Sequence, residues 1–394
     1  MMIDFSDKVK KLSFIFKKNG YEFYAVGGAV RDIILGKTPD DIDFCTNATP
    51  NEMLKMFPHS IKTGIKHGTL TIPFMGDFYE VTTYRIDGKY SDGRHPDNIK
   101  YSSNLKEDLS RRDFTINALA KDVESNEIID LFDGIKDIEL KRIKTVGKAE
   151  LRFSEDALRM LRAIRFEAKL GFSIEQDTMN AIKTNASLIR RVSKERIFTE
   201  FAKAVTSKYR NNAFKSLSSS GLWEEIFSCV QNKIITMHGS CFDISCSLAS
   251  FFILTNTAHD EINTTMLDLK TSNALRRDVL HLSDSYNLFL NKIPESDYEK
   301  RCFASFVQKQ YLNAFFDVLL TIGSPYYSFK QEYGKLTEYP LSIKELAING
   351  NNLAAIGYSG EKIKEMLNQA LDNVLKTPDN NTKEKLICFA KKQL

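Results

Sequence analysis

The sequence has few of the features that mark secreted, disulfide-bonded or membrane-spanning proteins. Its six cysteines are scattered along 394 residues, and no two form a Cys-x-x-Cys pair, so neither a zinc knuckle nor a disulfide framework is indicated. The N-terminus lacks a basic segment followed by an apolar core, and no apolar run is long enough to span a bilayer. We therefore expect a cytoplasmic protein without a membrane partner.

Charge of one sign is also not in large excess. The net charge is +4, which permits a nucleic-acid partner but does not establish one. With 394 residues, of which 42% are hydrophobic, the chain exceeds what a single ordinary core requires. The composition therefore predicts a protein of more than one domain.

Hydrophobic periodicity divides the chain into two parts. The first hundred or so residues mix strand-like and helix-like runs, which indicates an α/β head. From Ser154 onward helical periodicity dominates, so we expect an elongated, mostly helical remainder. Residues 86–100 lack an apolar period and predict a mobile loop within the head. The strand-like runs are 21–26, 43–45, 69–74 and 79–84, and the helix-like runs are 29–35 and 51–56.

Two aspartates, Asp41 and Asp43, form the first candidate site. In a strand, residues two apart point to the same face, so both carboxylates would project together while Ile42 and Phe44 enter the core. Two carboxylates that leave coordination positions open suit Mg²⁺, and two such ions could activate a hydroxyl and neutralise a leaving pyrophosphate. An isolated Asp-x-Asp is more often a solvated turn, here after Pro39.

The preceding glycines, Gly27 and Gly28, favour the metal interpretation. They follow an apolar strand and precede an amphipathic helix, where bare backbone amides and the positive helix end can hold a phosphate chain. Arg31, one turn into that helix, would add a fork of donors. The run matches neither Gly-x-Gly-x-x-Gly nor a Walker loop, so its weight comes from the two aspartates that follow it.

Two further segments carry candidate ligands. Glu80, in a run of alternating character, could bring a third carboxylate from a neighbouring strand, although an edge-strand glutamate facing solvent is the commoner case. Arg111 and Arg112 precede Asp113 and an apolar helical stretch. The planar fork of arginine matches phosphate oxygens, whereas an isolated Arg-Arg-Asp is more often a solvated helix start.

A third segment carries candidate base-reading groups. Ser154 is expected to cap a helix that has acids in its first turn. Asp156 and Arg159, one turn apart, would then present an acceptor and a donor fork side by side. Cytosine and adenine share an exocyclic amino group beside a ring-nitrogen acceptor, whereas uracil and guanine carry a carbonyl there. The pair would therefore accept C and A and reject U and G.

Together these segments resemble class II nucleotidyltransferases of the DNA polymerase beta superfamily, which include CCA-adding tRNA nucleotidyltransferases and bacterial poly(A) polymerases. The resemblance is specific through about residue 205, and a tail segment, 346–353, is similar to that of bacterial CCA-adding enzymes. Five blocks occur in the family's order: residues 27–32 with 41–43, 111–117, 130–134 with 137–138, 155–159, and 191–197.

The resemblance implies an α+β fold in which a polymerase-beta-like nucleotidyltransferase head precedes an elongated all-helical neck, body and tail. The expected boundaries are a catalytic head at 1–141, a nucleobase-recognising neck at 142–205, a body at 206–300 and a tRNA-binding tail at 301–394. The implied reaction is template-independent addition of CCA to the 3′ end of tRNA. The RNA 3′-hydroxyl would attack the α-phosphate of CTP or ATP and release pyrophosphate under two Mg²⁺ ions.

The resemblance also implies roles for individual residues. Two would be catalytic and would hold the metals, and seven would bind the nucleotide. Arg165 is the least secure of these, because it is rotated about half a turn from Asp156 and is better suited to structure or to phosphate. The metal ligands would be Asp41 and Asp43, the triphosphate ligands Gly28 and Arg31, the ribose or phosphate ligand Arg112, the base ligands Asp156 and Arg159, and the remaining contacts Arg162 and Arg165.

Several alternatives share parts of this pattern. A poly(A) polymerase or an enzyme that adds only the terminal A would have the same head, because stopping after three nucleotides depends on tRNA docking to the body and tail. Relatives that add only CC lack the loop that is present here at 87–100. A metal phosphohydrolase built on His259-Asp260 is disfavoured, because the six histidines offer no partner at ligand spacing. The intact Asp41 and Asp43 argue against a non-catalytic RNA-binding module.

Overall fold

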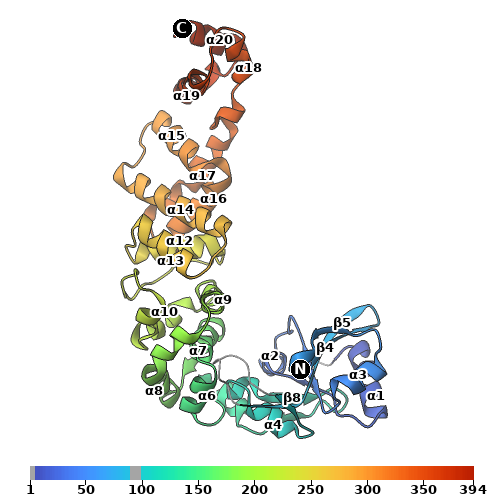
Figure 1. Cartoon of the computed structure of the whole chain (residues 1–394). Helices are drawn as coiled ribbons and strands as arrows, with labels where there is room; N and C mark the ends of the chain where they lie inside the picture. The colour runs from blue at the N-terminus through green and yellow to red at the C-terminus, as the bar shows by residue number, and fades with distance from the viewer. Residues whose placement is uncertain (1–4, 89–98) are drawn as a thin grey trace. The chain divides into compact units, whose positions relative to one another are not determined.

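The computed structural model describes residues 5–88 and 99–394, and its chain divides into two compact units, Met1–Ile226 and Phe227–Leu394 (Figure 1). The first unit contains a mixed sheet followed by helices, and the second is helical. All candidate site residues fall in the first unit. The sequence-based expectation of a sheet-containing head followed by a largely helical remainder is confirmed.

A seven-stranded mixed sheet forms the centre of the head, in the order β3-β4-β5-β2-β1-β8-β9. Strand β2 runs antiparallel to β1 and parallel to β5. The four strand-like runs of the sequence form β1, β2, β4 and β5, as predicted. The strands are β1 (Tyr24–Val26), β2 (Asp43–Thr46), β3 (Ile61–Gly64), β4 (Thr69–Phe74), β5 (Asp77–Thr83), β8 (Leu119–Asp122) and β9 (Ile128–Asp130).

Aromatic packing fixes the sheet to its first helix. Phe16 of α1 (Asp7–Lys18) stacks on Phe23, which stacks on Phe44 of β2, with 4.7 Å between ring centroids at each step. All three rings are buried, and each buried ring contributes about 2–3 kcal/mol of transfer free energy. Because Phe44 is anchored inside, its chain neighbour Asp43 must face the other side of the strand.

Shorter elements surround the sheet in the head. Helix α2 (Gly28–Ile34) follows β1, and α3 (Pro50–Met56) follows β2. Helix α4 (Leu105–Ser110) and the 3-10 turn η2 (Thr115–Asn117) precede β8. The ends of the predicted mobile loop form an antiparallel pair, β6 (Arg85–Asp87) and β7 (Ile99–Tyr101). The rest of that loop, at 89–98, lies outside the described residues.

The segment after the head is largely helical. One two-residue parallel ladder, β10 (Arg142–Ile143) with β11 (Ser173–Ile174), interrupts it, so this part is not entirely helical. The ladder ties the start of the segment to the end of α7. The helices are α5 (Gly134–Glu139), α6 (Ala149–Glu155), α7 (Leu158–Leu170), α8 (Gln176–Asn185), α9 (Lys194–Val205), α10 (Arg210–Ser219) and α11 (Leu222–Ile226).

The predicted helix start at Ser154 is wrong. Ser154 lies in the last turn of α6, which is anchored by the fully buried Phe153. The chain then leaves helical geometry at Asp156, with φ −141° and ψ 103°, and α7 begins two residues later. Serine and acids typical of a helix start therefore occur here at a helix end, because burial of Phe153 extends α6 through them.

The second unit contains nine α-helices and no strand, and all of its residues are described. In its C-terminal part, Met366, Ala370 and Val374 of α19 pack against Leu353 and Leu386, so the apolar face of this helix is a packing face. None of the described helices is long and apolar enough to cross a membrane. The helices are α12 (Ile244–Leu254), α13 (His259–Asp268), α14 (Asn273–Asn291), α15 (Asp297–Val307), α16 (Lys309–Thr321), α17 (Lys330–Lys335), α18 (Gly350–Ala354), α19 (Glu361–Lys376) and α20 (Lys383–Lys391).

A buried glutamate, Glu167, lies on α7, the helix that packs against α10. Burial raises the pKa of its carboxyl from 4.5 to about 7, and hydrogen bonds with Ser216 and the backbone of Ile174 only partly oppose this change. The folded state therefore binds this proton more tightly than the unfolded state does. As a result, the free energy of unfolding falls as the pH rises from 4.5 to about 7.

Replacing Glu167 with glutamine should remove this loss of stability. The difference between the two pKa values corresponds to about 3 kcal/mol. Above about pH 7, the free energy of unfolding of E167Q should therefore exceed that of wild type by up to this amount. The difference should vanish near the unfolded-state pKa of 4.5. Urea unfolding at both extremes measures it, with E127Q at an exposed loop position as control. A pH-independent difference would contradict the expectation.

Candidate active site

The turn between β1 and α2 forms one wall of a cavity. Gly27 caps α2 with φ 74° and ψ −136°, a backbone conformation that side chains rarely adopt. A Cβ atom on Gly27 would lie 3.0 Å from Nη1 of Arg112, and one on Gly28 would lie 3.3 Å from Nη2 of Arg31. The two glycines therefore let two guanidinium groups approach the backbone at the start of the helix.

Replacing Gly27 with alanine should raise the KM for the nucleotide. The left-handed backbone costs about 1–3 kcal/mol for a non-glycine residue, and the new methyl group would displace Arg112. Gly36 offers a matched control, because it has φ 70° and open space around its Cβ position. G36A should lose stability but keep the wild-type KM. G27A should lose stability and also bind nucleotide at least ~10-fold more weakly. Equal KM values for the two variants would contradict this assignment.

Asp43, the first residue of β2, lines the cavity and pairs in register with Val26. Desolvation and the neighbouring charge of Asp41 raise the pKa of the Asp43 carboxyl, and Arg112 opposes them. Asp41 precedes the strand, and its Oδ1 accepts a hydrogen bond from the backbone of Ile42 at 2.9 Å. Asp41 therefore lies just outside the strand in which the sequence placed both aspartates, and its charge is close enough to interact with that of Asp43.

The carboxylates that could hold a metal ion here are two, Asp41 and Asp43. Within the described part of the chain, no three His, Cys, Asp or Glu residues gather as a group that could hold a metal ion. The register between β2 and β5 pairs Phe44 with Val81, which puts Glu80 beside Asp43, but Glu80 is exposed and does not line the cavity. Two hard oxygen donors with open coordination positions fit Mg²⁺, which commonly completes its shell with phosphate oxygens and water.

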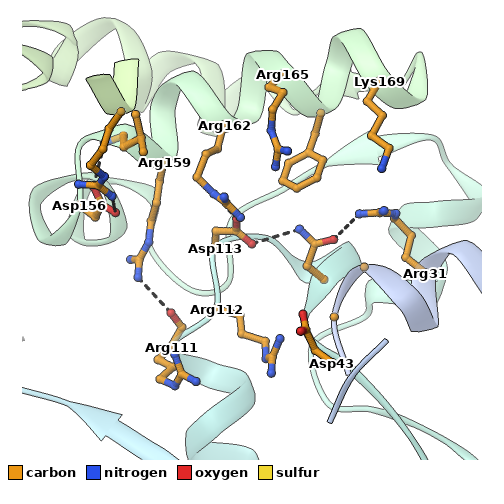
Figure 2. Close-up of a pocket in the computed structure, with 16 residues that line it drawn as sticks. Arg31, Asp43, Arg111, Arg112, Asp113, Asp156, Arg159, Arg162, Arg165 and Lys169 are labelled. Atoms are coloured by element: carbon orange, nitrogen blue, oxygen red, sulfur yellow. Dashed lines mark hydrogen bonds and ion pairs between the residues drawn. The ribbon is translucent and has the colours of Figure 1, made fainter. Parts of the chain in front are cut away.

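The cavity has a volume of about 460 Å³ and lies within the first unit (Figure 2). Cations outnumber carboxylates around it, which favours a polyanionic ligand such as a triphosphate. Figure 2 shows the side chains of Arg159, Arg162, Arg165 and Lys169 directed from α7 into the cavity. The charged residues that line it are Arg31, Arg111, Arg112, Arg159, Arg162, Arg165, Lys169 and Arg196, and the acids Asp43, Asp113 and Asp156.

The structure brings together most of the residues that the sequence singled out. Of the nine candidates, only Asp41 is not part of the cavity lining. The other eight come from the β1–α2 turn, the start of β2, the segment around Arg112, and the start and length of α7. They are Gly28, Arg31, Asp43, Arg112, Asp156, Arg159, Arg162 and Arg165.

A hydrogen-bonded chain links the two sides of the cavity, and Figure 2 shows its path. Nη1 of Arg31 donates to Oδ1 of Asn117 at 2.6 Å, and Nδ2 of Asn117 donates to Oδ1 of Asp113 at 3.2 Å. Arg162 on α7 donates to Oδ2 of Asp113 through Nε at 2.8 Å and Nη2 at 2.6 Å. Burial alone would raise the pKa of Asp113, but Arg162 holds it below the ordinary value.

A second buried carboxylate, Asp108, orients two arginines. Arg111 donates to its Oδ1 at 3.0 and 2.8 Å, and Arg112 donates to its Oδ2 at 3.2 Å. Burial would raise the pKa of Asp108, but the two guanidinium groups outweigh it and lower the pKa. The buried Nε of Arg112 has no hydrogen-bond partner among the described residues. Arg112 is thus held beside the glycine turn, where it lines the cavity.

The candidate base-reading residues are held by neighbours rather than by one shared helix. Asp156 precedes α7, accepts from the backbone of Leu158 at 3.1 Å, and accepts from Nη2 of Arg196 at 2.9 Å. Arg159 donates to Glu155 at 2.5 Å and to the backbone oxygen of Arg111 at 3.1 Å. The expectation that both stand on one helix is therefore wrong for Asp156, but the backbone N–H of Arg159 donates to the carbonyl of Asp156 at 3.0 Å and both residues line the cavity.

Phe166 packs beneath three of the cavity arginines. The guanidinium carbon of Arg165 lies 4.3 Å from the ring centroid, and those of Arg31 and Arg162 lie at 5.5 and 5.6 Å. Nε of Arg165 also lies 2.6 Å from Glu200 of α9. These contacts fix the directions of the cations.

The sequence analysis assigned no individual role to several residues that line this site, including Asp113, Asn117, Phe166, Lys169 and Arg196. Asp113 and Asn117 are 8% and 7% exposed, and burial of polar side chains beside arginines is invisible in a linear sequence. The signal available was that both stand in the 111–117 segment already singled out. Arg196 likewise stands in the 191–197 block, and only the structure places it against Asp156.

Comparison with known proteins gives consistent matches over most of the chain. Residues 23–144 match the poly A polymerase head domain family, and residues 171–234 match the family described as the probable RNA and SrmB-binding site of polymerase A. A CCA-adding enzyme of Lactobacillus delbrueckii subsp. bulgaricus is 37% identical over 379 residues, which cover 94% of this chain and 93% of that protein. A CCA-adding enzyme of Lactobacillus johnsonii is 42% identical over 282 residues, 70% of this chain and 71% of that protein.

A solved structure is similar over the same extent. The Bacillus stearothermophilus CCA-adding enzyme in complex with CTP superposes with a TM-score of 0.80 at 28% identity. The superposition covers 99% of this chain and 98% of that one. The likeness therefore includes the helical remainder as well as the head.

Proposed function

This chain belongs to the CCA-adding enzyme family, and we propose that the cavity between its head and α7 is where it binds CTP and ATP. It is a tRNA nucleotidyltransferase that adds CCA to the 3′ end of tRNA. The relatives named CCA-adding enzyme match nearly the full length of the chain.

One observation supports the cavity most strongly. Three kinds of side chain line one cavity of about 460 Å³. They are the carboxylate of Asp43 on β2, cations suited to phosphate such as Arg31 and Arg112, and the acceptor Asp156 with the donor Arg159. A nucleoside triphosphate needs these three kinds of group at its α-phosphate, its phosphate chain and its base. Segments more than a hundred residues apart in sequence supply them, so their meeting is a property of the fold.

The proposed division of labour follows the lining. Amides at Gly28 and the guanidinium groups of Arg31 and Arg112 would hold the triphosphate, because helix ends and arginine forks bind phosphate. Asp41 and Asp43 would hold Mg²⁺, which when bound supplies positive charge at the α-phosphate and favours deprotonation of the attacking 3′-hydroxyl. Arg162 and Arg165 would orient the nucleotide from α7, and Asp156 and Arg159 would bind its base.

The same proposal assigns the rest of the chain. The head at 1–141 would carry catalysis and the neck at 142–205 base recognition, while the body at 206–300 and the tail at 301–394 would bind tRNA. The match of residues 171–234 to a family described as a probable RNA-binding site supports RNA contact at the neck and the start of the body. We place the reaction in the cytoplasm, where tRNA, CTP and ATP are available together.

A single-nucleotide assay tests the function directly. The protein is incubated with tRNA that lacks its 3′ end and with each nucleoside triphosphate separately, then with CTP and ATP together. We expect two C residues from CTP, one A once CC is present, and no incorporation of U or G. An unlimited A tail would support a poly(A) polymerase, and A addition without C addition would support an A-only enzyme. Either outcome would overturn the CCA assignment.

A further inference from the structure

We propose that Asn117 is a positioning residue for nucleotide transfer, because its amide fixes the head cation Arg31 relative to the Asp113–Arg162 pair that joins the head to α7. The inference rests on the proposed function of the cavity. It assigns Asn117 a task that differs from substrate contact: it sets the spacing between the groups that hold the triphosphate and the helix that carries the base-reading arginine.

The chemistry of the two partners fixes the orientation of the Asn117 amide. A guanidinium group can only donate hydrogen bonds and a carboxylate can only accept them. Oδ1 of Asn117 therefore faces Arg31 at 2.6 Å, and Nδ2 faces Asp113 at 3.2 Å. Asn117 is 7% exposed and Arg31 is 2% exposed, so water is largely excluded from these bonds. A flipped amide would oppose donors to donors and acceptor to acceptor.

The amide adds a polar link between two elements that also share packing on Phe166 of α7. Arg31 stands on α2, directly after the glycine turn, and Arg162 stands on α7, one turn after Arg159. Asn117 and Asp113 bridge them with two intervening side chains. A nucleotide that contacts Arg31 with its phosphates and Arg159 with its base would span this bridge, so movement of the bridge would misplace one end of the substrate.

Neither an acid nor an apolar residue could replace this amide. An aspartate at position 117 would pair with Arg31 but would put a second carboxylate against Asp113, within 3.2 Å of its Oδ1. An alanine would leave Arg31 and Asp113 without one hydrogen-bond partner each inside a buried cluster. Asn117 is thus the single link whose donor and acceptor match both neighbours.

The decisive test compares N117D with the double variant D113N/N117D. N117D should lower kcat/KM for CTP and ATP by about 100-fold, as expected for misplacement of a reacting group by about 1 Å. It should also narrow the preference for CTP over UTP, which a merely structural residue would not change. The double variant reverses the order of acid and amide along the bridge and restores the net charge of the bridge. Its kcat/KM should therefore be at least ~10-fold higher than that of N117D.

The controls separate this inference from its premise. N180D changes an exposed asparagine on α8 in the same unit and should match wild type. Wild-type protein without CCA addition would refute the proposed function. If wild type is active and N117D has the same kcat/KM, the proposed role of Asn117 is overturned. It is also overturned if the loss in D113N/N117D equals the product of the losses in D113N and N117D. If N117D does not fold, judged by thermal unfolding, N117A takes its place, and unchanged KM and base preference would overturn the role.

Discussion

Changing Asp43 to asparagine is expected to reduce nucleotide transfer by at least about 10³-fold while leaving tRNA binding and folding intact. Asparagine keeps the size of the side chain but removes the charge that the proposed metal site needs. Losing one electrostatic contact to a developing negative charge commonly costs 10²–10³ in rate. Here both metal binding and charge stabilisation would be affected, so a loss of about 4 kcal/mol in transition-state stabilisation is expected.

The charge environment of Asp43 sharpens this expectation. Asp43 lines the cavity, and its raised pKa reflects desolvation and the neighbouring charge of Asp41. Two like charges held close together destabilise the empty site, and a bound cation relieves their repulsion. Removing one of them should therefore stabilise the protein slightly without metal while abolishing transfer. A variant that is more stable and less active would distinguish a functional carboxylate from a structural one.

The measurement is single-turnover incorporation of CMP into tRNA that lacks its 3′ end, with gel-shift titration of tRNA and thermal unfolding alongside. D40N provides the matched control, because Asp40 is an exposed acid directly before Asp41 and lies outside the cavity lining. D40N should transfer nucleotide at the wild-type rate. Retained activity in D43N would refute the metal assignment.

The head could be predicted from sequence because its signals are local. Alternation around Val81 and Phe44 and the glycines before Arg31 each act within a few residues, and the structure places strands and a helix where these patterns indicate. The residue types of the site were predictable for a related reason: the chemistry of phosphate and of metal ions restricts which side chains can serve. Eight of nine candidates accordingly line one cavity.

The errors arise where tertiary packing overrides a local signal. Ser154 looks like a helix cap, but burial of Phe153 continues α6 past it. Asp156 looks like an acid of the first helical turn, but its backbone is extended, and Arg196 from another helix donates a hydrogen bond to it. Asn117 looked like part of an apolar run, and its role depends on partners 4 and 86 residues away. No linear pattern encodes such distances.

Base selection is expected to weaken when either Asp156 or Arg159 is changed. Both line the cavity, and each already has protein partners that fix its direction. A bidentate contact to a base contributes about 1–3 kcal/mol of discrimination in comparable recognition. D156N and R159A should therefore reduce the preference for CTP over UTP by roughly 5- to 150-fold. The reduction should come from poorer use of CTP together with new incorporation of U.

Arg196 separates base recognition from a general loss of activity. Its Nη2 donates to Oδ2 of Asp156 at 2.9 Å, so R196A should leave the Asp156 carboxylate present but less well oriented. We expect R196A to shift the CTP-to-UTP ratio in the same direction as D156N but by less. The two changes should also be non-additive in the double variant, because both act on one carboxylate.

The ratio of kcat/KM for CTP and UTP, measured on one tRNA substrate, is the appropriate readout, because effects on tRNA binding and folding cancel in it. R190A is a suitable control, since Arg190 is a largely exposed arginine paired with Glu225 outside the cavity. It should leave the ratio unchanged. If D156N and R159A slow CTP and UTP equally, then both residues support the fold of the neck, and the base must be selected by other groups of the cavity.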